Sequence, residues 1–385
     1  MVLLPHTNII IDGFSFTAQL EQPHYIFFLT HFHSDHYQGL SPSWNRGPIY
    51  CSPQTALLIC DKFSGIPNIY PLEIGETYWI SLNLKNCAGV NVTFIDANHC
   101  PGAVMILFQG EIGTILHTGD FRYTPRMLLE PCLNNSSNSL IPINQLILDN
   151  TFCMPEYDFP SQEMCTKLII QIIEENPNYD TWIAIENFGR ETLLVELSLY
   201  FNTLVIVSES MFRRIEILGL RPDLFSTNSD DGWIHAVPRK HMFRIYQRNR
   251  EGLDTIGIYL SGWYKKYSKE WPFYHVPYSL HSSFSEIKEF VEKIKPERLS
   301  YIVAPGKSLM GVFELSRKVL EDVAKDENMM EGIEFKPPVK RKIGSGGGGY
   351  LKKLKKPKTI GCKIAESEEI DEHPEINKYT MHYYI

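Results

Sequence analysis

The sequence predicts an α/β protein with two structured units and a flexible C-terminal tail. Short apolar runs that end in polar residues recur through the first 155 residues, as expected of buried strands that open into loops. From residue 156 onwards, helix-like and strand-like segments alternate, which is typical of a separate α/β unit. Beyond residue 336 the chain is rich in Lys, Gly and Pro, which is the composition of a linker.

The apolar runs of the first part predict six strands. They lie at 9–12, 25–30, 90–96, 103–108, 114–120 and 145–150. In layered α/β folds, ligands and catalytic groups collect where strands end. His31, His99, Asp120 and Asp149 lie at or just after such ends, so we treat them as candidates for a functional site.

The second part predicts helices and strands in alternation. We expect helices at 162–175, 192–201 and 211–219, and strands at 182–186 and 204–208. The segment 276–296 then predicts a short strand, a Ser-rich turn, and a helix that either Ser283 or Ser285 caps. A last strand begins at residue 299.

Charge and composition exclude several classes of protein. No apolar run approaches the roughly 20 residues that span a bilayer, and the N-terminus lacks the basic start of a signal peptide. The eight cysteines contain no CxxC pair, which favours a reduced, intracellular chain. Residues 336–363 hold ten Lys or Arg and no acid, so all 45 acidic residues lie elsewhere. That basic stretch is either a nuclear import signal, a nonspecific nucleic-acid contact or a solvated tail.

A cluster of metal-ligand residues lies in LTHFHSDHYQGL, at 29–40. Alternate side chains of an extended segment share a face, so His31 and His33 can point to one centre. Asp35 and His36 follow a turn and could serve a second centre. Imidazole and carboxylate groups are the expected ligands of zinc, and packing does not explain four such residues at this spacing. Further ligands at strand ends are His99 in DANHCPG, Asp120 in HTGDFRYTP, Asp149 in LDNT and His281 in SLHSS.

These motifs together resemble the metallo-β-lactamase nucleases. The strings THFHSDH, DANHCPG and TGDFRYTP, with Asp12 upstream, carry the resemblance to that fold. LDNT at 148–151 and HSS at 281–283 resemble the β-CASP branch, which acts on nucleic acids. DANHCPGAVM, GTILHTGDFRYTP and CSPQTA are similar to the DNA repair members of that branch. The resemblance covers about residues 1–335.

The resemblance implies a four-layer αββα metallo-β-lactamase domain with an inserted α/β β-CASP cap domain and a disordered basic C-terminal tail. We therefore expect the first part of the metallo-β-lactamase domain at 1–155 and the β-CASP domain at 156–274. A return segment of the first domain would follow at 275–335, and a flexible Lys/Gly-rich tail at 336–385.

The resemblance also implies a metal centre with one or two zinc ions. It assigns His31, His33 and His99 to one ion. The second ion, which could instead be magnesium or manganese, would take Asp35, His36 and His281, with Asp120 bridging both, and Asp12 and Asp149 would orient the histidines. The residues expected to act in catalysis are Asp35, His36, Asp120, Asp149 and His281.

The implied activity is a zinc-dependent 5′-to-3′ DNA exonuclease that releases 5′-phosphate nucleotides. Its expected partners are DNA that is single-stranded or has a 5′-phosphate end, together with telomere or repair proteins in the nucleus, at chromosomes and telomeres. It would act in telomere end processing and interstrand crosslink repair, with no membrane partner. The expected phosphate contacts are Thr151, Arg190, Ser282 and Ser283.

Two departures from the family pattern define the alternatives. Leu280 precedes His281 where these relatives usually carry Asp, which leaves open a catalytically weak scaffold protein. Val303 stands where RNA-processing relatives carry His, which favours DNA over the alternative of an RNA-processing endonuclease. A small-molecule hydrolase is disfavoured because a cap of more than about 100 residues suits a polymer groove better than a small ligand.

Overall fold

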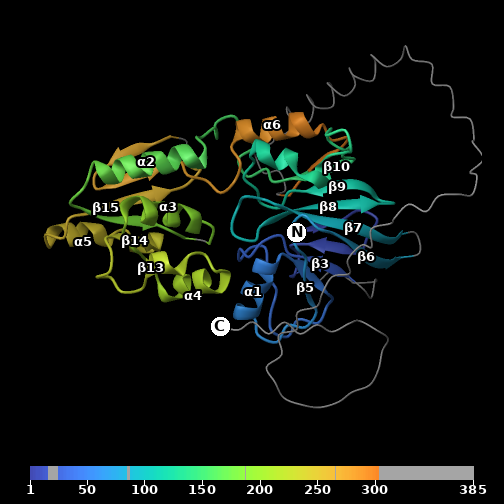
Figure 1. The fold of residues 1–385 in the computed structure, drawn as a ribbon, viewed down its shortest axis with the longest axis horizontal. Coiled ribbons are helices and arrows are strands. Elements are labelled where there is room, and N and C mark those ends of the chain that lie inside the picture. Colours follow the sequence, from blue (N-terminus) through green and yellow to red (C-terminus); the bar gives the residue numbers. More distant parts are fainter. Residues whose placement is uncertain (16–24, 85–86, 187, 265, 303–385) are drawn as a thin grey trace, which may run out of the picture.

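The computed structural model describes residues 1–15, 25–84, 87–186, 188–264 and 266–302. It contains three β-sheets with helices against their faces, and each sheet mixes parallel and antiparallel strands (Figure 1). The predicted α/β class is therefore confirmed. The expected tail at 336–385 and Val303 lie outside the described residues. Within the described residues, no helix is long and apolar enough to cross a membrane.

The first sheet has five short strands in chain order. They are β1 (Val2–Leu3), β2 (Ile9–Ile11), β3 (Ile26–Phe28), β4 (Ile49–Cys51) and β5 (Ile69–Pro71). Strands β2 to β5 run parallel, so their carboxyl ends meet at one edge. Helix α1 (Pro53–Lys62) starts at Ser52, whose hydroxyl accepts a hydrogen bond from the backbone N–H of Thr55.

The second sheet has six strands, and the last of them arrives from the far end of the described chain. In spatial order they are β18 (Leu299–Tyr301), β10 (Gln145–Leu148), β9 (Gly113–His117), β8 (Val104–Gly110), β7 (Cys87–Asp96) and β6 (Thr77–Leu84). Strands β6 to β9 form an antiparallel meander, whereas β9, β10 and β18 are parallel. Helix α6 (Phe284–Ile294) packs on this sheet. Along the chain, the short 3₁₀ helices η1 (Pro125–Leu129) and η2 (Pro131–Leu133) connect β9 to β10.

Apolar side chains stack these elements as helix, sheet, sheet and helix. The two sheets share a core in which the Phe28 ring lies 5.3 Å from that of Phe108. Ile59 of α1 packs on the outer face of the first sheet, and Phe290 of α6 on the outer face of the second. Figure 1 shows α1 and α6 on opposite sides of the paired sheets. Burial of both faces explains why these strands read as continuous apolar runs.

The third sheet has a core of its own. Its strands, in spatial order, are β13 (Phe225–Ser226), β12 (Val205–Ile206), β14 (Ile234–Val237), β11 (Asp180–Ala184), β15 (Thr255–Leu260), β17 (Phe273–Val276) and β16 (Ser268–Glu270). All are parallel except β16. Its helices are α2 (Gln162–Glu174), α3 (Glu191–Phe201), α4 (Glu209–Leu218), α5 (Arg244–Arg250), η3 (Pro222–Leu224) and η4 (Arg239–His241).

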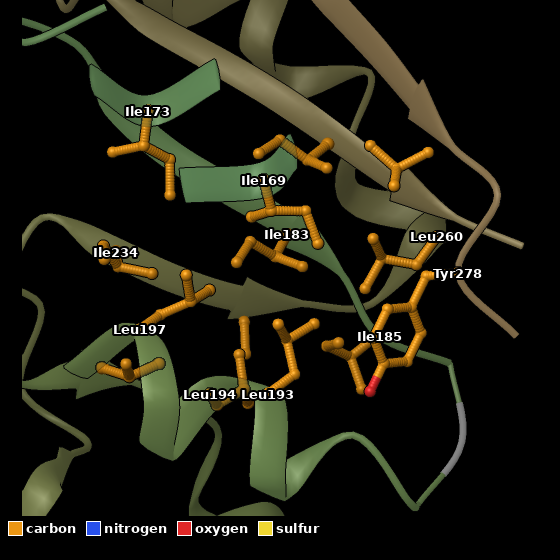
Figure 2. Packing of buried hydrophobic residues seen from close by; sticks show 14 of the residues in the cluster. Ile169, Ile173, Ile183, Ile185, Leu193, Leu194, Leu197, Ile234, Leu260 and Tyr278 are labelled. Atoms are coloured by element: carbon orange, nitrogen blue, oxygen red, sulfur yellow. The ribbon is translucent and has the colours of Figure 1, made fainter. Parts of the chain in front are cut away.

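Helices α2 and α3 cover the same face of this third sheet. Figure 2 shows Ile169 of α2 and Leu194 of α3 packed around Ile183 of β11. Helix α5 packs on the opposite face, where Ile245 joins a smaller apolar cluster. The helices thus enclose a parallel sheet on both faces, as an α/β unit requires. The boundaries expected at 155 and 274 stay a prediction.

The predicted elements recur with shifted ends. All six strands expected in the first part are present, as are the three helices expected in the second. The strand expected within 276–280 is corrected: β17 ends at Val276, and Pro277 to Leu280 are irregular. Pro277 has no N–H for a ladder hydrogen bond, which accounts for that end.

The sequence left Ser283 and Ser285 as alternative caps of α6, and the structure selects Ser283. Its hydroxyl accepts from the N–H of Glu286, whose carboxylate accepts from the N–H of Ser283, so the pair forms a capping box. We predict that Ser283→Ala lowers the free energy of unfolding in urea by about 1 kcal/mol. Ser285→Ala is the control, because the Ser285 hydroxyl donates to the exposed Asp158 and contacts the Ser283 hydroxyl at 3.3 Å, but caps no N–H of the helix. An equal loss in both variants would contradict the assignment.

Candidate metal centre

The candidate ligands meet where strands of the first two sheets end. His31 and His33 follow β3, His99 follows β7, and Asp120 follows β9. His281 comes from the irregular segment after β17, far along the chain. These strands belong to stacked sheets whose ends open on the same side, so ligands from four separate segments reach one place.

The carboxylate of Asp120 lies at the centre of this cluster. Its Oδ2 is 3.7 Å from His31 Nε2, 3.3 Å from His36 Nε2, 3.8 Å from His99 Nε2 and 3.9 Å from His281 Nε2. The preceding Gly119 has a positive φ of 53°, and a Cβ there would lie 3.0 Å from both Thr30 Cβ and Val104 O. Glycine is therefore needed to bring Asp120 this close to the segment that carries His31.

Two overlapping groups of ligand atoms have the compactness of metal sites. In each group, one ligand atom per residue lies within 4.8 Å of all the others. The first group is His31, His33, His99 and Asp120, and the second is Asp120, Asp149 and His281. Asp120 is common to both, as a bridging ligand would be.

Backbone carbonyls fix the tautomers of two of these histidines. His33 Nε2 lies 2.6 Å from the carbonyl oxygen of Phe188, and His99 Nδ1 lies 3.0 Å from that of Leu280. A carbonyl only accepts, so each of these ring nitrogens carries the proton. His33 Nδ1 and His99 Nε2, which are 3.1 Å apart, are then both bare when the rings are neutral.

His31 and His36 are oriented in the same way through Asp12 and Thr30. The Thr30 hydroxyl donates to Asp12 Oδ2 at 2.8 Å, so it can only accept from His31 Nδ1, 3.0 Å away. His36 Nδ1 donates to Asp12 Oδ2 at 2.8 Å. In both rings the Nδ1 proton is thus held on the outer side, while His31 Nε2 lies 2.9 Å from His33 Nδ1 and His36 Nε2 lies 3.3 Å from Asp120 Oδ2.

Asp149 has the corresponding contact with His281. Its Oδ2 accepts from His281 Nδ1 at 2.7 Å, while its Oδ1 accepts from the hydroxyl and the N–H of Thr151, at 2.6 and 3.0 Å. Buried carboxylates behind metal-binding histidines fix the ring and strengthen the opposite nitrogen as a ligand. The orienting role expected of Asp12 and Asp149 stays a prediction, and Asp149 is also a member of the second compact group.

The pKa values follow from this arrangement. Burial, reinforced by the neighbouring imidazoles, lowers the pKa of His31 and His99, and burial also lowers the pKa of His33. Burial opposes protonation of His36 and His281 too, but the charge of Asp12 raises the pKa of His36 to about 11, and that of Asp149 raises the pKa of His281 to about 9. The first three rings are therefore neutral, as ligands must be.

The donor set fits a metal ion for an electrostatic reason. Bare nitrogens of His31, His33 and His99 converge with a carboxylate in a place from which water is largely excluded. Lone pairs this close repel one another unless a cation lies between them. Three imidazoles and one carboxylate suit zinc and similar ions, so the cluster can hold a metal.

The expected ligand Asp35 lies apart from both groups. Its side chain is 78% exposed, and its Oδ2 is 3.6 Å from His36 Nε2. His36 itself faces Asp120, although it belongs to neither compact group. The catalytic and metal-binding roles of these two residues stay predictions.

Two expected phosphate contacts, Ser282 and Ser283, have hydrogen-bond partners within the fold. The Ser282 hydroxyl is buried, donates to Phe121 O and accepts from the N–H of Tyr123, both at 2.9 Å. Ser283, also buried, caps α6 with its hydroxyl and its N–H. The Ser283 hydroxyl also lies 3.3 Å from that of Ser285, so both serines have partners within the fold, and their phosphate contacts stay predictions.

The side chains of Thr151 and Arg190, in contrast, keep some hydrogen-bonding capacity that no described residue uses. The Thr151 hydroxyl donates to Asp149 and retains acceptor capacity only. Arg190 directly precedes α3 as its N-cap residue, and its Nε is buried with no hydrogen-bond partner among the described residues. Its guanidinium therefore has a donor available for an anion.

Sequence reasoning missed the groups that hold the His281 segment. Arg122 is buried and donates to the carbonyls of Ser279, His281 and Pro160 and to the carboxylate of Glu286. It lies inside TGDFRYTP, so the motif contained it, but only the fold reveals its partners. The carbonyls of Phe188 and Leu280 had no sequence signal, since every residue has one.

Comparisons with known proteins agree with these observations. The profile of a family described as DNA repair metallo-beta-lactamase matches residues 204–306. The chain is 41% identical over 302 residues to 5′ exonuclease Apollo of Danio rerio, covering 78% of this chain and 52% of that protein. It is 32% identical over 331 residues to DNA cross-link repair protein SNM1 of Arabidopsis thaliana, covering 79% and 65%. The chain thus spans about half the length of the Apollo relative.

We predict that zinc stabilises the protein through the first group of ligands. After treatment with a chelator, zinc at 100 times its Kd should add about 2.7 kcal/mol to the free energy of unfolding and raise Tm. His99→Ala should abolish that rise, whereas His235→Ala, a half-buried histidine on β14, should retain it. Calorimetry checks both. An undiminished rise in His99→Ala would place the zinc elsewhere.

Proposed function

This chain belongs to the DNA repair metallo-β-lactamase family, and we propose that it is a metal-dependent 5′-to-3′ exonuclease that hydrolyses DNA to 5′-phosphate nucleotides. The observation that carries the proposal is the convergence of bare histidine nitrogens on Asp120. The name 5′ exonuclease Apollo, borne by relatives from several vertebrates, supports the polarity of the reaction. Because the chain covers only part of those proteins, the activity of the whole is proposed here.

We propose zinc for the group of His31, His33 and His99. A second ion, whether zinc, magnesium or manganese, would take Asp35, His36 and His281, with Asp120 shared between the two. Two such ions lower the pKa of water and neutralise the charge of a phosphodiester. This local neutralisation suits a chain whose 45 acidic residues outnumber its 37 basic ones.

The residues of the chain then have distinct tasks. Asp12 and Asp149 hold the Nδ1 protons of His36 and His281 on the outer side of each ring, which keeps Nε2 available. Asp120 supplies the central negative charge. Cleavage would break the bond between phosphorus and the 3′ oxygen, with water providing the new oxygen of the 5′-phosphate product.

We propose that the third sheet and its helices are the β-CASP cap expected at 156–274. Two contacts support a functional link to the metal centre. Phe188, in the loop after β11, orients His33, and Gly189 packs so closely that a Cβ there would lie 3.2 Å from His99 O. A cap joined this directly to the ligands could present a DNA end to them.

Arg190 is our proposed contact for the 5′-phosphate. It directly follows the loop that touches His33 and His99, and it is one of the residues that line a small cavity, together with Arg239, Glu186 and Tyr259. Burial lowers its pKa, although nearby Tyr278 and Glu191 oppose this, so the cation is poorly solvated. A buried donor without a partner gains from an anion, and a guanidinium can bind phosphate through two hydrogen bonds.

The cellular setting is proposed on broader grounds. The name DNA cross-link repair protein, printed for the plant relative, supports a role in interstrand crosslink repair. We propose action in the nucleus and at telomeres, with telomere or repair proteins as partners, from the family resemblance and the basic stretch at 336–363. The presence of Leu280 instead of Asp is weak support for the scaffold alternative. The contact that Leu280 makes with His99 goes through its backbone carbonyl, which any residue at this position would have.

We predict that the zinc-loaded protein shortens 5′-phosphorylated single-stranded DNA from its 5′ end. A gel time course with a 3′ label, on DNA and matched RNA, measures this directly. Asp120→Asn should remove nearly all turnover, because it weakens the charge shared by both ion sites. Internal cuts in RNA would favour the RNA-processing endonuclease, and tight DNA binding without cutting would favour the scaffold.

We also predict that Arg190→Met selectively impairs recognition of the 5′-phosphate. The preference for 5′-phosphate over 5′-hydroxyl ends, measured as a ratio of kcat/KM, should fall about 10- to 150-fold. This factor corresponds to the free energy that one hydrogen bond to a charged group contributes. Arg221→Met is the control, because Arg221 is exposed and pairs with Asp223. An unchanged ratio in Arg190→Met would show that another group reads the phosphate.

A further inference from the structure

An exposed tryptophan lies beside the metal centre. Trp263 is 60% exposed, in the turn that follows β15. Its ring contacts those of Phe152, at 4.8 Å between centroids, and Tyr157, at 5.2 Å. The Phe152 ring in turn lies 6.1 Å from that of His281. Two ring contacts therefore separate Trp263 from a candidate ligand.

Neither aromatic neighbour stacks in parallel on Trp263. The Phe152 and Tyr157 rings are inclined to it by 62° and 86°. Such edge-to-face packing holds the indole without stacking a second ring on it. Together with its exposure, this leaves aromatic surface of Trp263 accessible to a flat ligand.

The turn is built to hold this side chain in place. A Cβ on Gly262 would lie 2.7 Å from Phe152 and 3.0 Å from Ser279, so only glycine allows the turn to press this closely. The N–H of Trp263 donates to the Ser261 hydroxyl at 3.3 Å. On the other side, the Tyr264 hydroxyl accepts from Arg239 at 3.0 Å. Trp263 is thus anchored from both neighbours.

We propose that Trp263 is a stacking platform for a nucleobase of the DNA strand whose phosphate lies at the metal centre. This inference rests on the proposed function. Every base has a π-face, so an aromatic platform binds single strands with little regard to sequence. Stacking also needs no positive charge, which suits an acidic chain. In this role Trp263 is a positioning residue that aligns the strand with the metal centre.

The experiment compares substrates with and without bases. One is a 5′-phosphorylated single strand, and the other is the same strand with abasic sites at its first three positions. Each is given to the zinc-loaded full chain and to Trp263→Ala, Trp263→Phe and Trp271→Ala. Trp271 is the matched control, because it is 54% exposed but packs on Tyr179 at the far end of the third sheet.

Trp263→Ala should lower kcat/KM on the normal strand about 5- to 150-fold, mainly through KM, and leave the abasic strand unaffected. Trp263→Phe should recover most of the loss, and Trp271→Ala should change neither substrate. Equal losses on both substrates in Trp263→Ala would overturn the proposal, since they indicate a disturbed fold. So would no loss on either.

Binding separates this inference from the proposed activity. If the wild-type chain cuts neither strand, the exonuclease proposal fails, and fluorescence anisotropy with the same labelled strands still decides the role of Trp263. The Kd of the normal strand should rise in Trp263→Ala by the same factor, while that of the abasic strand stays constant. A Kd independent of Trp263 on both strands would refute stacking.

Discussion

The hydrogen bonds from His33 to Phe188 and from His99 to Leu280 are the constraint on which the candidate site depends. Each carbonyl takes the outward proton of a ring, and so decides that the inward nitrogen is bare. Both carbonyls belong to segments that connect to the third sheet, whereas both histidines follow strands of the first two sheets. The geometry of the candidate ligands therefore depends on the position of the segments after β11 and β17 relative to the first two sheets.

The carboxylates of Asp12 and Asp149 also accept the outward proton of a histidine ring. Asp12 and Asp149 are buried, and each behaves as a stable anion because it accepts several hydrogen bonds. For both, burial favours the neutral acid, but the opposing charge of His36 or His281 keeps the pKa low. A carboxylate that remains charged beside an imidazole strengthens the nitrogen on the far side of that ring. Negative charge that would otherwise destabilise the core is thus used to improve a cation site.

The sequence predicted which side chains converge better than it predicted their surroundings. The spacing of His31 and His33 and the strand-end positions of His99 and Asp120 were sufficient, because strand geometry converts spacing into direction. The tautomers were not predictable, since a backbone carbonyl has no residue-type signature. Ser282 and Ser283 were ambiguous in the sequence: a Ser-rich turn before a helix predicts a cap and an anion site equally well, and the hydrogen bonds establish the structural role of both serines. Leu280 drew attention to its side chain, while its carbonyl does the orienting.

The arrangement also suggests how an acidic chain can handle a polyanion. Long-range attraction to DNA requires excess positive charge, and the described part of the chain has little to offer. On the proposed function, recognition of DNA would then come from short-range contacts near the strand end. A metal cluster can neutralise one phosphate, the poorly solvated Arg190 can bind another, and an aromatic surface can hold a base without charge. Each of these contacts is strong only after local desolvation. Such a site would therefore bind a strand end that fits it more tightly than it binds an arbitrary stretch of DNA backbone. An acidic surface would strengthen that preference by weakening nonspecific binding elsewhere.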